Sequence, residues 1–471
     1  MVAQYRTRPA IGLALAFSIA ATFSGGLRPA AAQALKSYRA ALGESSVSGI
    51  SSGAFMAVQF GVAWSSIVKG VGVVAGGPYY CAQAKASDFF NEYISPILTA
   101  TGPCMNGPPP DLAPMLEAVT QKAAEAAIDP PDLVKRQKIY LFHGYNDAVV
   151  ARSVTDAAER FYRTWLGNAA SGNLFYQNAL GAGHSFVVAN RQDPELDSCA
   201  DNKKPYIDRC GYDQAGIILQ HIYGALNPPT PGPLGGTLKS FDQSHYTGSD
   251  IPGALSLSDK GYVFVPKSCE QGAGCRVHVA LHGCLQDAGS IGKLFVRQSG
   301  YNAWADSNRI IVLYPQTESS PFLPLNPKAC WDWWGYVTHD SSYVAKSGKQ
   351  IAAIKSMLDA LTANGAPAPV QSGAAVRLIV NDISDAAAAL AWTPVAGASL
   401  YRLERAGADG QFQTVGETAG PSFGDRGLAP ATAYAWRVRA LFEGVEQAPS
   451  NVAKAATRPT PAPCAKPGSC P

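Results

Sequence analysis

Two patterns of hydrophobic and polar positions follow each other along the chain. From Leu35 to about residue 365, short apolar runs alternate with longer amphipathic stretches. A short apolar run is typical of a buried strand, and an apolar residue at every third or fourth position is typical of a helix. Strands that alternate with helices predict an α/β fold built on a mostly parallel sheet.

The expected elements of this first part fall on both sides of a proline- and glycine-rich connector. The runs that predict strands are Tyr38–Ser48, Val71–Ala75, Lys138–Phe142, Gly261–Pro266, Arg276–Leu281 and Arg309–Tyr314. The stretches that predict helices are Ala54–Trp64, Ala113–Ala127, Val154–Trp165 and most of Ile291–Asn308. Between the two groups, residues 227–236 read Asn-Pro-Pro-Thr-Pro-Gly-Pro-Leu-Gly-Gly, which excludes both a helix and a central strand there.

Beyond residue 366 the pattern changes to short runs that alternate with a period of two. These runs are Val376–Val380, Ala388–Trp392, Tyr401–Arg405 and Ala433–Ala440, and they predict an all-β sandwich. Trp392, together with Leu428-x-Pro-x-Thr-x-Tyr434, resembles a fibronectin type III domain, in which such a tyrosine anchors its hydroxyl on upstream backbone. We expect this domain at residues 370–457, with Trp392 and Tyr434 as core residues, followed by a proline-rich tail at 458–471.

The first 34 residues have the layout of a secretory signal. Arg6 and Arg8 precede an apolar run from residue 10 to residue 23, and small residues follow, with cleavage after Ala32 or Ala34 equally compatible. The run is too short to span a hydrocarbon core of ~30 Å comfortably. We therefore expect residues 1–34 to be removed and the mature protein to be soluble and extracellular, passing through the periplasm in transit.

Composition and charge narrow the class of protein. With 47% hydrophobic and 15% charged residues, the chain is neither disordered nor collagen-like. The formal charge of +3 comes from three arginines of the signal segment, and the remainder is neutral without a basic cluster. Such a chain is a poor partner for nucleic acid or an anionic membrane. We expect it to act as a monomer.

The ten cysteines fit an exported protein. Eight form pairs that are close in sequence, and Cys284 and Cys330 are left over; the close pairs are Cys81 with Cys104, Cys199 with Cys210, Cys269 with Cys275, and Cys464 with Cys470. An even number with this spacing predicts five disulfides, although proximity alone does not fix their connectivity. No CxxC motif or His/Cys cluster has the spacing of zinc ligands, so we expect neither a metal nor another cofactor.

A candidate nucleophile follows the first expected strand. Residues Gly49-Ile-Ser-Ser-Gly53 fit the G-x-S-x-G pattern, in which small residues flank a serine on a strained strand-to-helix turn. A plain Gly/Ser turn is the alternative interpretation. The expected helix beginning near Ala54 favours the nucleophile, because amides at a helix N-terminus can bind an oxyanion. We identify Ser51 as the candidate.

A serine nucleophile needs a base and an orienting carboxylate. His184 lies in a small-residue loop, Gly181-Ala-Gly-His184, and Asp147 directly follows the expected strand Lys138–Phe142. The chain order Ser51, Asp147, His184 is that of α/β-hydrolases. His143 ends the same strand and is expected to pack rather than act as the base; His221, His245, His278 and His339 are expected to be structural or solvent-facing.

The second donor of an oxyanion hole normally comes from a loop before the nucleophile, and the first is the amide just after it, here Ser52. Only about fifteen mature residues precede Ser51, too few for the necessary strands. The strand ending in His282-Gly-Cys284 is the candidate instead. If Cys284 supplies the amide, the α/β-hydrolase fold is circularly permuted, and the connector at 227–236 joins the former termini.

Longer motifs resemble the extracellular poly(3-hydroxybutyrate) depolymerases of the permuted catalytic type over roughly residues 38–340. They are Gly49-Ile-Ser-Ser-Gly-Ala-Phe-Met-Ala-Val-Gln59, Ala75-Gly-Gly-Pro-Tyr-Tyr-Cys-Ala82, Leu281-His-Gly-Cys-Leu-Gln286, Gly300-Tyr-Asn-Ala-Trp-Ala305, Leu313-Tyr-Pro-Gln316 and Asn326-Pro-Lys-Ala-Cys-Trp-Asp-Trp-Trp-Gly-Tyr336. The resemblance implies the triad Ser51, Asp147 and His184, the oxyanion amides of Ser52 and Cys284, and a Cys284–Cys330 disulfide. We expect the catalytic domain at residues 35–365.

Three tryptophans, Trp331, Trp333 and Trp334, stand within four residues. In an extended segment Trp331 and Trp333 would share one face and Trp334 would take the other. Core packing is the ordinary explanation for any one of them. As a group we expect them to line an apolar slot for methyl-bearing ester chains.

The expected function is that of a secreted serine esterase acting on a polyester or oligoester of 3-hydroxybutyrate. One alternative is a carboxylesterase of the same fold that removes feruloyl or acetyl groups from plant polysaccharide. Another is a non-catalytic surface protein whose sandwich domain binds polymer.

Overall fold

The computed structural model describes residues 33–83, 94–109, 111–190, 194–272, 274–321, 324–363, 378–392, 398, 400–407, 410–420, 422–442, 445–446 and 449–460. Residues 1–32 of the expected signal segment lie outside these residues, and so does the expected boundary near residue 366. In the described residues no helix is long and apolar enough to cross a membrane.

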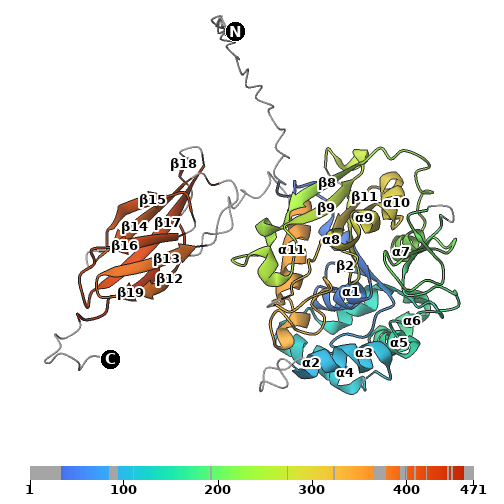
Figure 1. Cartoon of the computed structure of the whole chain (residues 1–471). Helices are drawn as coiled ribbons and strands as arrows, with labels where there is room; N and C mark the ends of the chain where they lie inside the picture. Colours follow the sequence, from blue (N-terminus) through green and yellow to red (C-terminus); the bar gives the residue numbers. More distant parts are fainter. Residues whose placement is uncertain are drawn as a thin grey trace, which may run out of the picture. The chain divides into compact units, whose positions relative to one another are not determined.

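The first part is built on an eight-stranded sheet with the order β4-β3-β2-β1-β10-β11-β9-β8. Figure 1 labels β2, β8, β9 and β11 of this sheet. The strands from β4 to β11 pair in parallel, and β9 and β8 pair antiparallel. The predicted α/β class with a mostly parallel sheet is confirmed. The strands are β1 (Ser45–Ile50), β2 (Val68–Val74), β3 (Lys138–Phe142), β4 (Leu174–Gln177), β8 (Thr237–Asp242), β9 (Lys260–Val265), β10 (Arg276–Leu281) and β11 (Ile310–Tyr314).

Helices cover both faces of this sheet, and alternate strand residues face each layer. In β11, Ile311 and Leu313 join the cluster that includes α1 and α11, while Val312 and Tyr314 join the cluster that includes α7 and α10. Successive side chains of a strand point to opposite faces, so a buried strand such as β11 contributes side chains to the core on each side of the sheet. The main helices are α1 (Ser52–Ala63), α5 (Arg152–Leu166) and α11 (Lys349–Thr362) on one face, and α7 (Gln214–Tyr223), α9 (Leu294–Gln298) and α10 (Tyr301–Asn308) on the other.

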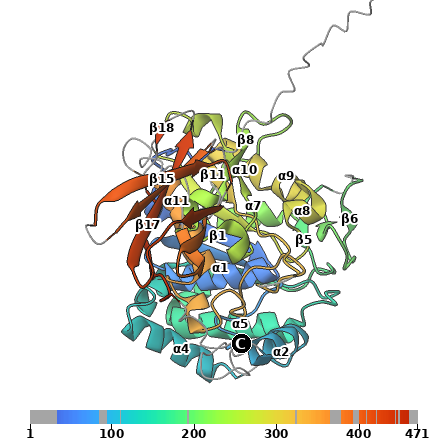
Figure 2. The same cartoon turned by 60° about the vertical axis from the view of Figure 1, so that its left-hand side comes forward.

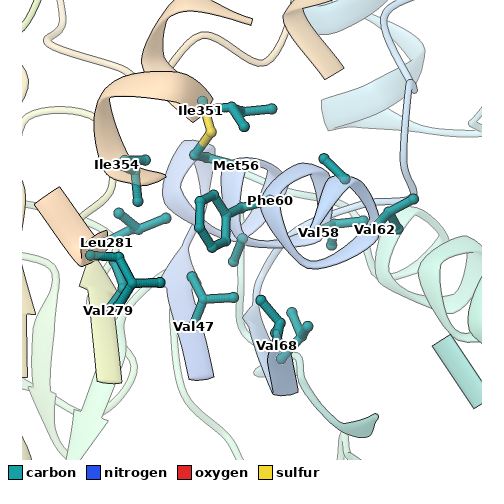
Figure 3. Close-up of a cluster of buried hydrophobic side chains, with 14 of the residues drawn as sticks. Val47, Met56, Val58, Phe60, Val62, Val68, Val279, Leu281, Ile351 and Ile354 are labelled. Atoms are coloured by element: carbon teal, nitrogen blue, oxygen red, sulfur yellow. The ribbon is translucent and has the colours of Figure 1, made fainter. Parts of the chain in front are cut away.

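Helix α1 is buried along its whole length. Figure 3 shows it between strand residues such as Val47 and Val279 and the α11 residues Ile351 and Ile354. Apolar residues occupy every side of it, as expected for a helix with no solvent face, and the buried Gln59 donates to the carbonyl oxygens of Asp332 and Tyr343. The residue before it, Ser51, is thereby fixed at the end of β1 by packing on both sides.

Shorter elements complete this part. They are α2 (Ser95–Thr101), α3 (Pro103–Asn106), α4 (Ala113–Ala124), α6 (Ala170–Asn173), α8 (Ala288–Ile291) and a small sheet of β5 (Phe186–Val188), β7 (Ile207–Arg209) and β6 (Asp197–Ser198). Figure 2 shows α2, α4 and α5 along one end of the molecule's α/β part. The stretch 291–308 is helical as predicted but divided, because Gly300 adopts φ 89° between α9 and α10.

The order of the strands in the chain is circularly permuted. Strand β1, which leads to Ser51, comes first in the chain, and its parallel neighbour β10 comes more than 200 residues later with Gly49 opposite Leu281. In an unpermuted α/β-hydrolase the strand that precedes the oxyanion loop comes before the nucleophile strand. After α7 the connector 227–236 leads into the edge strand β8, where the predicted junction of the former termini lies.

The second part contains two antiparallel sheets, as predicted for a sandwich. One is β12-β13-β16 and the other is β15-β14-β17-β18, with β19 also on β17. The bounds are β12 (Leu378–Ile383), β13 (Ala387–Trp392), β14 (Leu400–Ala406), β15 (Phe412–Thr418), β16 (Ser422–Arg426), β17 (Ala433–Phe442), β18 (Val445–Glu446) and β19 (Ala453–Ala456).

The core of the sandwich draws on both sheets. It includes Trp392 from β13, Leu403 from β14 and Trp436 from β17. Tyr434 packs against this cluster, and its hydroxyl oxygen accepts a hydrogen bond from the Ala429 amide at 3.0 Å. This contact is the backbone anchor predicted for the tyrosine of a fibronectin type III-like sandwich.

Four disulfides are formed within the part of the chain that the structure describes: Cys81–Cys104, Cys199–Cys210, Cys269–Cys275 and Cys284–Cys330. The first three confirm the pairs predicted from proximity. The fourth confirms the pair that the family resemblance implies. The fifth disulfide was predicted between Cys464 and Cys470. Because Cys464 and Cys470 both lie outside the described residues, that disulfide stays a prediction.

Candidate active site

Ser51 occupies a strained bend between β1 and α1. Its backbone adopts φ 56° and ψ −123°, a conformation that side-chain-bearing residues rarely take. The flanking glycines are sterically required, because a Cβ on Gly49 would lie 2.1 Å from the carbonyl oxygen of Gly53, and a Cβ on Gly53 would lie 2.3 Å from that of His282. The G-x-S-x-G pattern therefore has the geometry of a nucleophile elbow.

Asp147 and His184 are hydrogen-bonded to each other. Nδ1 of His184 lies 2.9 Å from Oδ2 of Asp147. The other oxygen of Asp147 accepts hydrogen bonds from the amides of Val149 and Val150 at 2.8 and 2.9 Å. Because an ionised carboxylate only accepts, Nδ1 carries the proton and Nε2 is left with its lone pair. The imidazole is thus in the tautomer that a general base needs.

The charge of Asp147 is maintained although its side chain is completely buried. Burial alone opposes ionisation, but the His184 imidazole and the amides of Val150 and Val149 outweigh it and hold the pKa of Asp147 below its usual range. The carboxylate is therefore ionised at neutral pH.

His143 has the packing role that the sequence predicts. Its Nε2 donates to the carbonyl oxygen of Val150 at 2.9 Å and lies 3.9 Å from Oδ2 of Asp147. His278 is fully buried, with Nδ1 2.7 Å from the Ser46 hydroxyl and Nε2 2.8 Å from the Ser48 hydroxyl. Burial lowers the pKa of His278 to about 3, so it is neutral. Its role is structural.

The loop after β10 reaches the serine. A Cβ on Gly283 would lie 3.3 Å from Cβ of Ser51, so the His282-Gly283-Cys284 backbone runs directly beside the bend. Ser52 begins α1, where helix amides face outward without intrahelical partners. The amides of Ser52 and Cys284 therefore come from two segments that meet at Ser51, the arrangement of an oxyanion hole.

Buried side chains fix this loop. Gln286 accepts a hydrogen bond from the Gly283 amide at 2.7 Å and donates to the carbonyl oxygens of Pro205 and Tyr206. The amide of Thr317 donates to Nε2 of His282, and Nδ1 of His282 donates to the carbonyl oxygen of Gly283. No role was predicted for Gln286 from sequence, although it ends the Leu281–Gln286 motif.

A cavity of about 320 Å³ opens over Ser51, His184 and Cys284. Apolar side chains form most of its wall, which suits a ligand that is largely apolar. Besides those three residues it is lined by Phe55, Ile97, Ala100, Thr101, Met105, Val149, Val150, Tyr206, Leu285, Leu325, Asn326, Pro327, Lys328, Cys330, Trp333 and Trp334.

The tryptophan segment differs from the expectation. Trp333 and Trp334 both line the cavity, and Trp333 stacks on Phe55 with ring centroids 4.2 Å apart. Trp331 is fully buried in the core and is absent from the cavity wall, so its assignment as a lining residue is wrong. The extended alternation fails because the segment turns: the buried Asp332 carboxylate accepts the amide of Tyr336 at 2.9 Å.

A further residue, Asn202, joins the segments that carry Asp147 and His184 and was not predicted from the sequence. Its Oδ1 accepts the amides of both Ala148 and His184, at 2.9 and 2.8 Å. An asparagine followed by two lysines gave no signal, because such residues are common in solvent-exposed loops.

The permuted sheet, the strained serine at the end of β1 and the hydrogen-bonded Asp147–His184 pair define a hydrolase of the α/β-hydrolase class. No family model matches the chain. Poly(3-hydroxybutyrate) depolymerase of Delftia acidovorans is 37% identical over 420 residues, covering 87% of this chain and 78% of that protein. Polyhydroxybutyrate depolymerase of Talaromyces funiculosus is 38% identical over 340 residues, covering 70% and 92%. The chain belongs to the poly(3-hydroxybutyrate) depolymerase family.

Solved structures agree over the α/β part. The crystal structure of PHB depolymerase from Penicillium funiculosum matches with a TM-score of 0.61 at 35% identity, covering 70% of this chain and 99% of that one. A serine-to-alanine variant of a PHB depolymerase in complex with an R3HB trimer matches with the same score and coverage.

Proposed function

We propose that this protein hydrolyses poly(3-hydroxybutyrate) or its oligomers through a Ser51–His184–Asp147 triad. Ser51 Oγ attacks the ester carbonyl, and Nε2 of His184 takes the proton and returns it to the leaving hydroxyl. Asp147 orients the imidazole and stabilises its charged form. Water, activated by the same imidazole, then releases the 3-hydroxyacyl group from the serine.

The amides of Ser52 and Cys284 stabilise the oxyanion in both steps. Such preorganised donors are typically worth about 10²–10³-fold in kcat each. The Cys284–Cys330 disulfide supports this assignment, because it ties the donor loop to the tryptophan segment of the cavity wall.

The observation that carries the proposal is the hydrogen bond between Asp147 and His184, whose side chain lines the same cavity as Ser51. The relatives that are named for this polymer, and the related structure that binds an R3HB trimer, support the substrate. The apolar cavity wall supports it as well.

We further propose that the enzyme acts outside the cell as a monomer, with residues 35–365 as the catalytic domain and 370–457 as a separate sandwich. Four disulfides support an oxidising compartment. Amino-terminal sequencing of the secreted protein tests whether the signal segment is removed. We expect the mature chain to begin directly after Ala32 or Ala34. Sedimentation analysis tests the monomer.

The decisive test compares the wild type with Ser51→Ala. The wild type is expected to release 3-hydroxybutyrate from polymer film and to take up a serine-directed phosphonate at Ser51, and the variant is expected to do neither while keeping its fold. Release of ferulate or acetate from polysaccharide, with no product from the film, would contradict the substrate. Unchanged activity of the variant would contradict the mechanism.

A further inference from the structure

We propose that Asn202 is a positioning residue. It holds the backbones that carry the carboxylate and the imidazole of the triad at a fixed separation. The inference rests on the proposed function, since it concerns the same site. Three segments are involved: the acid loop (residues 144–150), the base loop (residues 180–185) and the clamp loop (residues 199–202).

The side chain of Asn202 uses its complete hydrogen-bonding capacity on these loops. Oδ1 accepts the amide of Ala148 at 2.9 Å and the amide of His184 at 2.8 Å. Nδ2 donates to the carbonyl oxygen of Asn146 at 3.0 Å and to that of Ala200 at 3.2 Å. An amide side chain has two acceptor lone pairs and two donor hydrogens, so all four positions are occupied.

The bonded backbone groups immediately flank the reacting side chains. Ala148 and Asn146 are the two neighbours of Asp147, and the third contact is the amide of His184 itself. One planar group therefore fixes the separation between the two backbones on which the Asp147–His184 hydrogen bond depends. A misplacement of about 1 Å at a reacting group can cost about 10²-fold in rate.

The clamp loop is itself held in place. The Cys199–Cys210 disulfide anchors its first residue, and the carbonyl oxygen of Cys199 accepts the amide of Gly183 at 2.8 Å. A Cβ on Gly183 would lie 1.9 Å from the carbonyl oxygen of Asp201, so the clamp loop and the base loop pack backbone to backbone. Asn202 is thus presented from a fixed support.

A backbone contact between acid and base loops also exists without Asn202. The amides of Tyr145 and Asn146 donate to the carbonyl oxygens of Leu180 and Ala182. These bonds join the loops ahead of Asp147 and His184, whereas Asn202 joins them at the reacting residues. Loss of Asn202 is therefore expected to loosen the pair without unfolding the loops.

The test uses Asn202→Ala and Asn202→Ser, assayed on a soluble chromogenic butyrate ester and normalised to sites titrated with a phosphonate. We expect kcat to fall about 10–100-fold with KM changed less than about twofold. The acidic limb of the kcat/KM profile is expected to move to lower pH, because a loosened carboxylate stabilises the imidazolium less. Asn202→Asp keeps an oxygen for the amides of Ala148 and His184 but places its second oxygen against the carbonyl oxygens of Asn146 and Ala200. Its kcat is therefore expected to stay below that of the wild type.

Asn302→Ala is the matched control. Asn302 is another asparagine bonded through both side-chain atoms, donating to the Val296 carbonyl oxygen and accepting from the Tyr314 hydroxyl in the α10 layer. The variant is expected to lower Tm while kcat per titrated site and the pH profile stay those of the wild type.

Wild-type kcat and an unshifted acidic limb in whichever Asn202 variant folds would overturn the inference. Ser51→Ala separates this result from the larger proposal. If Ser51→Ala is inactive while the Asn202 variants are unaffected, only the positioning role fails. If Ser51→Ala remains active, the proposed function fails.

Discussion

The indole N–H of Trp331 donates to the carbonyl oxygen of His282 at 2.9 Å, across 49 positions of the chain. The bond joins the tryptophan segment to the loop that presents the Cys284 amide. The two ring centroids of Trp331 and His282 are 5.4 Å apart, so the contact combines packing with a hydrogen bond. Trp331 thereby helps to fix the loop that forms the candidate oxyanion hole.

Trp331→Phe should therefore lower kcat while keeping the ring in the core. We expect a loss of about tenfold, smaller than for removal of a donor itself, because the amide remains but is less well fixed. Steady-state kinetics on a soluble ester measures it. Trp304→Phe is the control, since it removes a partly buried indole hydrogen bond to Asp213 at 2.8 Å in the α7–α10 layer. Equal losses of kcat in both variants would contradict a specific role for Trp331.

Gly53→Ala should nearly abolish activity. The new Cβ would lie 2.3 Å from the carbonyl oxygen of His282 and 2.6 Å from that of Leu281, so β10 and the elbow must separate. We expect kcat/KM to fall at least about 10²-fold, together with a lower Tm. Gly43→Ala, where no atom lies within 4 Å of the new Cβ, should leave both unchanged. An active Gly53→Ala enzyme would show that the contact is not needed.

Asp208→Asn should change the pH dependence of stability. Asp208 is fully buried on β7, and burial, reinforced by the carboxylates of Asp197 and Asp201, raises its pKa to about 8. Between the ordinary pKa near 4 and about 8, the folded protein holds a proton that the unfolded chain has released. The free energy of unfolding therefore falls as pH rises through this window.

Asparagine resembles the protonated side chain and does not titrate. The stability of Asp208→Asn relative to the wild type should thus increase between pH 5 and pH 9, by on the order of 2–4 kcal/mol. Calorimetric Tm values at the two pH values test it. A Tm difference that is constant with pH would mean that Asp208 ionises normally.

Deletion of residues 366–471 should spare the hydrolysis of soluble esters. The buried cluster of the sandwich, from Leu378 to Ala440 in sequence, shares no residue with the clusters of the α/β part. We expect kcat/KM on a chromogenic butyrate ester to change less than about twofold. Unfolding of the truncated protein, seen as a lost thermal transition, would show that the two parts are one folding unit.

The features that could be predicted from sequence share one property: they are encoded locally. Strands β3 and β10 were predicted with their observed bounds, because their apolar runs are bordered by polar residues. Asp147 follows the first of these strands and Cys284 follows the second, and loops at the carboxyl ends of parallel strands meet at one edge of a sheet. For that reason the residues of the candidate site could be predicted from the sequence.

The features that were missed depend on contacts between distant segments. Trp331 enters the core because Asp332 and Asn326 accept the amides of Tyr336 and Cys330 and turn the chain, which no alternation rule anticipates. Asn202 and Gln286 act by bonding to backbone groups of other loops. Any residue type can supply a backbone amide or carbonyl group, so the sequence does not show which polar side chains will bind one.

The late position of β10 sets the order in which the site can be assembled during synthesis. Ser51, Asp147 and His184 are synthesised first. The loop with Cys284, the proposed second oxyanion donor, leaves the exit tunnel about 100 residues after His184. Until that strand inserts beside β1, the nascent polypeptide has an exposed central edge and an incomplete reaction centre. In the proposed mechanism, the second oxyanion donor thus joins the site only when the sheet closes.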